Sequence, residues 1–65
     1  MDEHYVGILI KAPDMRRAEW LTPRGTLTTK RLHAGMTERS VAEATAERLR
    51  ADDPDCIVTV RQLVP

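Results

Sequence analysis

The side chains best suited to chemistry in this chain are one thiol, two imidazoles and a cluster of carboxylates. Cys56 could act as a nucleophile if a base lay beside it. The residues before it are largely acidic, and their charge disfavours a thiolate. Cys56 also begins an apolar run, so we expect a buried structural thiol with a raised pKa. The acidic residues that precede it are Asp52, Asp53 and Asp55.

His4 and His33 pair in sequence neither with each other nor with a serine, so no acid-base pair is expected. One cysteine and two histidines at these spacings do not make a zinc site. The aspartate cluster lacks the glycine and the distant glutamate of a calcium loop, and Pro54 interrupts it. We therefore expect no catalytic residue, no metal site, no cofactor and no enzymatic activity. The aspartates are expected to form a solvated helix exit that could serve as an acidic contact.

The basic residues offer a different chemistry. Residues 16–33 hold five basic side chains against Glu19 alone, a net charge of +4, while residues 38–55 have a net charge of −3. A basic hairpin with a tryptophan could bind phosphate and stack a base. The zero net charge of the whole chain favours instead a solvated hairpin with a core tryptophan. The candidate contact residues for a partner or a nucleic acid are Arg16, Arg17, Trp20, Arg24, Lys30 and Arg31.

The hairpin that carries these residues follows a strongly apolar first strand, expected over residues 4–11. Residues 17–22 and 26–28 predict the two hairpin strands. A turn over residues 22–25 joins them, with proline second and glycine last. Both faces of the first strand are apolar, which predicts a central place in its sheet. The alternation puts Val6, Ile8 and Ile10 on one face and Tyr5, Gly7 and Leu9 on the other.

A helix is expected to begin at Thr37 or Ser40 and to end near Ala51. Ser40 and Glu43 have the spacing of a capping box. The apolar stripe of this helix consists of Val41, Ala42, Ala46 and Leu49. A last strand is expected over residues 56–64, with Cys56, Val58 and Val60 facing one way and Ile57, Thr59 and Arg61 the other.

These elements predict a single domain over residues 1–65 with an α+β fold. The order is β-β-(β)-α-β, two layers with one helix packed on a small, mainly antiparallel sheet. We expect the first and last strands side by side in the centre, because they are the most hydrophobic. One alanine-lined helix can cover only one sheet face, so the chain is expected to form a homodimer or to bind a protein, by face packing or edge pairing. The candidate dimer face is Tyr5 and Leu9.

About half the chain resembles short, uncharacterised bacterial and phage proteins with a β-β-α-β fold. The resemblance implies the same fold but no shared function, and this chain lacks the phenylalanine that such proteins usually carry before the helix. Small phage-encoded inhibitors, including anti-CRISPR proteins, often have this size. The residues that carry the resemblance are Trp20-Leu21-Thr22, Gly25, Thr28-Thr29-Lys30-Arg31, Ala34, Met36, Thr37, Ala42-Glu43-Ala44 and Leu49.

The longest apolar run is five residues, far below the roughly 20 that span a membrane. The first residues are acidic where a secretory leader is basic, so a cytoplasmic location is expected. The leading hypothesis is a small protein-binding regulator or inhibitor encoded by a phage or mobile element. The alternative is a nucleic-acid-binding module that uses the basic hairpin. No membrane partner or small-molecule substrate is expected.

Overall fold

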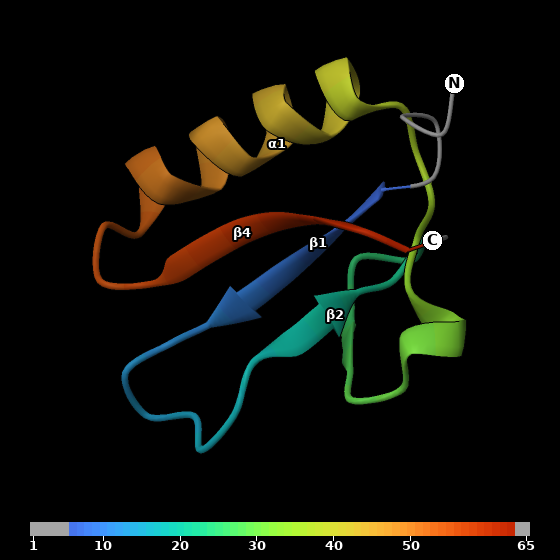
Figure 1. Cartoon of the computed structure of the whole chain (residues 1–65). Coiled ribbons are helices and arrows are strands. Elements are labelled where there is room, and N and C mark those ends of the chain that lie inside the picture. The colour runs from blue at the N-terminus through green and yellow to red at the C-terminus, as the bar shows by residue number, and fades with distance from the viewer. Residues whose placement is uncertain (1–5, 64–65) are drawn as a thin grey trace.

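The computed structural model describes residues 6–63, which form one antiparallel sheet with a helix packed on one face (Figure 1). This confirms the predicted α+β fold and the predicted order of its elements. The sheet order is β3-β2-β1-β4, and every pairing is antiparallel. The elements are β1 (Val6–Lys11), β2 (Glu19–Leu21), β3 (Leu27–Thr28), the 3-10 turn η2 (Arg31–His33), α1 (Arg39–Asp52) and β4 (Ile57–Gln62).

The first and last strands are neighbours, as predicted, and they pair along six residues from Val6 opposite Gln62 to Lys11 opposite Ile57. The expectation that both lie in the centre is wrong for β4. In the described part of the chain, β4 forms one edge of the sheet and β1 lies between β4 and β2. The reason is that the hairpin strands β2 and β3 both add on the other side of β1, so none is left to cover β4.

The start of α1 differs from the prediction. Glu38 is the residue at the N-cap position, its side chain makes no capping bond, and Ser40 already lies inside the helix. The predicted capping box is therefore wrong. Thr37 instead pairs with Val6: its carbonyl accepts from the Val6 N–H at 3.3 Å and its N–H donates to the Val6 carbonyl at 3.1 Å. Because these bonds hold Thr37 extended, the helix begins only at Arg39.

The core lies between α1 and the strands β1 and β4. Val6, Ile8 and Val58 pack there against Ala42 and Ala46, and Val6 is fully buried. Alanines at these helix positions let α1 come close to the sheet, as predicted. Ile10, Leu49, Val60 and the thiol of Cys56 complete the cluster from its margin.

Val41 does not belong to this core, which corrects the predicted stripe. The helix face centred on Ala42 and Ala46 points at the sheet, and Val41, about 100° around the helix from Ala42, lies on its flank. Its side chain is 52% exposed. The helix therefore buries less aliphatic surface than its sequence suggested, and a second apolar strip runs along its side.

The hairpin strands β2 and β3 are shorter than predicted, because each is paired for only two residues. Their connecting turn is the predicted one: the Gly25 N–H donates to the Thr22 carbonyl at 3.0 Å. Gly25 has a φ of 87°, a left-handed conformation that glycine adopts without strain. No helix within residues 6–63 is long and apolar enough to cross a membrane.

Candidate functional site

The thiol of Cys56 is tied to the helix exit. Its Sγ donates to Oδ2 of Asp53 at 3.3 Å. This hydrogen bond, then desolvation, then the negative charges of Asp53, Asp14 and Asp55 raise the pKa of the thiol above its usual 9.0. The raised pKa agrees with the expectation, but Cys56 is half-exposed rather than buried. A thiol held in the protonated form is a poor nucleophile.

The aspartates of the helix exit are all exposed. Asp53 is the C-cap residue of α1, and its N–H donates to the Leu49 carbonyl at 3.0 Å. His33 lies exposed in η2, and His4 lies outside the described residues. Across residues 6–63, no three His, Cys, Asp or Glu side chains come close enough to share a metal ion. The exposed residues Asp52, Asp53 and Asp55 therefore form a patch of negative charge at the C-terminal end of α1.

The basic candidates do not gather at one place. Arg16 and Arg17 lie in the loop before β2, whereas Arg24 lies in the turn after it, so the strand separates them. All three are exposed, as is Lys30. Arg31 donates through Nη2 to the carbonyl of Leu63, which ties η2 to the residue after β4. A structural contact thus engages one member of the proposed basic set.

Trp20, the aromatic candidate, lies on the sheet face opposite α1. It pairs with Leu9 of β1 on one side and with Thr28 of β3 on the other. Leu9 pairs in turn with Thr59 of β4, so one row of four side chains crosses the whole sheet. Paired residues of antiparallel strands share a face. Because Leu9 alternates with the core residues of β1, this row lies on the face that α1 does not cover.

We define the open face as the side of the sheet opposite α1. Leu9 and Trp20 are half-buried at its centre. Ile57, two residue pairs along from the row and on the same face, is 66% exposed. Leu63 lies over Gly7, where a Cβ would come within 3.0 Å of the leucine Cδ1. The open face comprises Gly7, Leu9, Lys11, Trp20, Thr28, Ile57, Thr59, Arg61 and Leu63.

The candidate dimer face is thus described in part. Leu9 lies at the centre of the open face, as the alternation predicted, and Tyr5 lies outside the described residues. Sequence reasoning placed Ile57 on the opposite side from Val58 but did not nominate it as a contact. Its alternation with Val58 and Val60 was the signal that could have done so. No sequence pattern indicated that Leu63 would fold onto Gly7.

A second apolar feature lies on the helix side, where α1 leaves the hairpin strands uncovered. A groove of about 250 Å³ opens between the flank of α1, the end of β2 and the chain that leads into the helix. Its apolar lining comes from Ile8, Leu21, Met36 and Val41. Met36 and Val41 are more than half exposed at its rim. The apolar stripe predicted for the helix placed Val41 in the core, so this groove was not expected from the sequence.

Comparison with models of protein families, with curated proteins and with solved structures finds no match to this chain.

Proposed function

We propose that this chain is a small, non-enzymatic module that binds another protein through the open face of its sheet. The supporting observation is the row formed by Leu9 and Trp20 on a face that α1 leaves uncovered, with Ile57 mostly exposed beside it. Tryptophan is enriched among the residues that dominate binding energy at protein interfaces. A central aromatic and aliphatic cluster on an exposed face is typical of a docking surface.

The rim of the open face indicates the chemistry of the partner. Arg61 is exposed beside the apolar centre on β4, and Thr28 and Thr59 end the central row. Lys11 flanks the centre on β1, although its Nζ already donates one bond to the Met15 carbonyl at 2.9 Å. Basic and hydroxyl groups at the rim complement carboxylates and stay partly hydrated. The proposal is therefore a partner with an apolar patch bordered by acidic side chains.

A photo-crosslinking amino acid at Thr28 tests this proposal in the native host. Thr28 lies directly opposite Trp20, at the sheet edge farthest from β4. We expect a covalent product with a different protein, and we expect Trp20→Ser in the same chain to abolish it. The matched control is the crosslinker at Ala44, which is exposed on α1, on the other side of the sheet.

The measurement is a mass shift on a denaturing gel, followed by identification of the crosslinked peptide. Products of equal yield from Thr28 and Ala44 would show nonspecific contact. A product at Thr28 that survives Trp20→Ser would remove the open face from the proposal. Absence of any product at Thr28 in the native host would contradict the proposed function.

A regulatory or inhibitory role encoded by a phage or mobile element, in the cytoplasm, belongs to the same proposal. Its support is the resemblance described above and the small size of the chain. A module of this size presents one face and acts by occupying a surface of its target. The resemblance adds no residue to the open face beyond Trp20 and Thr28.

Nucleic-acid binding remains the alternative and has less support. The basic side chains lie at both ends of β2, and Arg31 bonds to Leu63. Binding of this kind weakens steeply as salt rises. A mobility-shift assay at low salt, with Arg24→Glu as the test variant, distinguishes the two proposals. A shifted band at low salt that Arg24→Glu abolishes would favour the nucleic acid.

A further inference from the structure

Along the outer edge of β4, backbone hydrogen-bonding groups point away from β1, and their direction follows from two contacts. The N–H and the C=O of Val6 both form hydrogen bonds with the backbone of Thr37, which lies on the side of β1 away from β4. In an antiparallel pair, residues alternate between those whose backbone groups point toward the neighbour and those that point away. Val6 and Gln62 are therefore a non-hydrogen-bonded pair, and the backbone N–H and C=O of Gln62 point away from β1, outward from the sheet.

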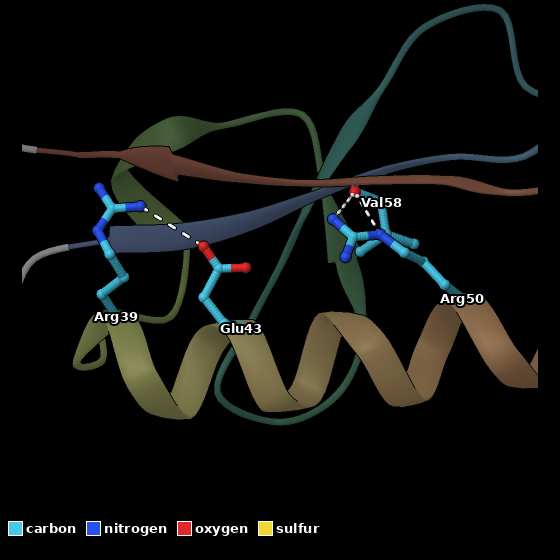
Figure 2. Close-up of polar contacts among 4 residues, drawn as sticks. All are labelled: Arg39, Glu43, Arg50 and Val58. Atoms are coloured by element: carbon cyan, nitrogen blue, oxygen red, sulfur yellow. Dashed lines mark hydrogen bonds and ion pairs between the residues drawn. The ribbon is translucent and has the colours of Figure 1, made fainter.

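The same alternation turns Val60 and Val58 outward. An independent contact agrees with this direction: Arg50 donates from Nη2 and Nε to the Val58 carbonyl, at 2.6 and 3.1 Å (Figure 2). The Val58 carbonyl therefore points away from β1 and accepts its bonds from Arg50 of α1. Along this edge the N–H groups of Val58, Val60 and Gln62 point outward, together with the carbonyls of Val60 and Gln62.

The two edges of the sheet differ in length within the described residues. β3 has two residues, whereas β4 has six. Short edge strands limit pairing with other chains, and a long edge with outward backbone groups is a template for another strand. The outward N–H and C=O groups come from every second residue of β4, which is the pattern that a strand running antiparallel to it can pair with.

We propose that β4 pairs antiparallel with β4 of a second copy, about a two-fold axis at Val60. The two four-stranded sheets then join into one sheet of eight strands. Val60 exchanges both backbone bonds with Val60 of the second copy, and Val58 pairs with Gln62. Val58 is only 5% exposed and Arg50 bonds to its carbonyl, so the Arg50 side chain must shift before Val58 can pair with Gln62 of the second copy. The Val58 carbonyl has two lone pairs, so it can then accept from Gln62 while Arg50 keeps one bond.

The side chains support this register. On the open face, exposed Ile57 lies opposite half-buried Leu63 of the second copy, and Thr59 lies opposite Arg61. On the helix side, Val60 lies opposite Val60. A shift of the axis by one residue toward the C-terminus would instead place Arg61 directly opposite Arg61, and like charges in that position are destabilising.

The helices also fit this arrangement. Since α1 lies over β1 and β4, and strands are about 4.8 Å apart, the two α1 helices of the dimer lie roughly 10 Å apart. That is an ordinary helix packing distance. The side of α1 toward β4 carries Arg39, Glu43 and Arg50 (Figure 2), so charges of both signs meet across the antiparallel pair.

Sedimentation velocity over a concentration series up to about 1 mM tests the proposal with the full chain. We expect a monomer–dimer equilibrium. Val60→Pro removes the central donor, whose N–H points away from β1, and should abolish the dimer. Circular dichroism verifies that this variant still folds.

A charge swap tests the register without altering the backbone. In a Thr59→Lys dimer, the new ammonium group of each copy lies opposite Arg61 of the other copy, which makes two like-charge pairs. We expect the dissociation constant to rise roughly 2- to 30-fold. Adding Arg61→Glu to Thr59→Lys should restore it. Thr28→Lys is the control, because Thr28 lies on the same sheet face at the opposite edge.

A chain that stays monomeric throughout the series overturns the proposal. So does a dimer that Thr59→Lys and Val60→Pro leave unchanged, or one that Thr28→Lys weakens as much as Thr59→Lys. The crosslinker at Thr28 lies away from β4, so these results are independent of whether a different protein occupies the open face.

Discussion

The part of the molecule built from α1, β1 and β4, which we call the packed half, encloses the core. The part built from β2 and β3, which we call the thin half, lies outside that core. All but one of the buried apolar side chains in residues 6–63 belong to α1, β1 or β4. No residue of β2 or β3 is buried. β1 and β4 pair along six residues, while β2 pairs for two with each neighbour.

The difference separates folding from recognition. Burial of apolar area is the main source of stability, so the packed half holds the fold together. The thin half carries Trp20 and most of the basic candidates, and its short strands present them with little of their surface used by the core. A surface that contributes little to stability can change for a partner without loss of the fold.

The largest expected effect is Ile8→Ala in the packed half. Ile8 is 5% exposed, and removing such a side chain costs about 2–5 kcal/mol. A domain of this size has roughly 3–10 kcal/mol in total, so the variant should lose a large share of its stability. Leu27→Ala, in the thin half and 42% exposed, should cost about 1 kcal/mol. Equal urea midpoints for the two variants would contradict the difference in packing between the two halves.

A smaller effect is expected from Ala46→Leu. Ala46 is fully buried where α1 meets the sheet, and overpacking there should cost about 1–3 kcal/mol by urea denaturation. Ala44→Leu, on the exposed side of the same helix, should change stability by less than about 0.5 kcal/mol. If Ala46→Leu proved neutral, the close approach of helix and sheet would not be a constraint.

Arg50→Ala should cost about 1 kcal/mol, because it removes the bonds to the Val58 carbonyl from a side chain that is itself exposed. Arg48→Ala, an exposed neighbour in the same helix, is the control and should change stability by less than about 0.5 kcal/mol. Thermal melts of the two variants measure the difference. The same loss from both would mean that helix charge, and not the contact with β4, is responsible.

The smallest effect concerns Cys56. Its folded pKa is raised above 9.0, so the folded state holds the thiol proton more tightly than the unfolded state. The resulting stability is fully present below pH 9 and is lost as pH rises through the folded pKa. Absorbance of the thiolate at alkaline pH should show a midpoint above 9.0. Asp53→Asn should lower that midpoint, and Asp52→Asn should not.

The order of elements was predictable because it depends on local signals. The apolar first strand, the turn over residues 22–25 and the alternation of the last strand each have their cause within a few neighbouring residues. The adjacency of β1 and β4 followed from their shared hydrophobicity. The place of Leu9 on the uncovered face followed from its alternation with Ile8 and Ile10.

The errors arose where distant contacts override local preference. Ser40 and Glu43 have the right spacing for a cap, but the pairing of Thr37 with Val6 fixes the start of the helix. Val41 matched the apolar stripe, yet it lies on the flank of α1 and lines the groove instead of packing in the core. The contact of Arg31 with Leu63 spans half the chain and has no local signature.

The pairing of the first strand with the last has a consequence for how the chain is made. Val6 and Gln62 lie far apart in the sequence, so β1 stays without its partner until β4 has left the ribosome. Contacts between such distant residues also slow folding for a domain of this length. During synthesis the most apolar strand is therefore exposed, and nascent chains stalled before β4 should be substrates for chaperones.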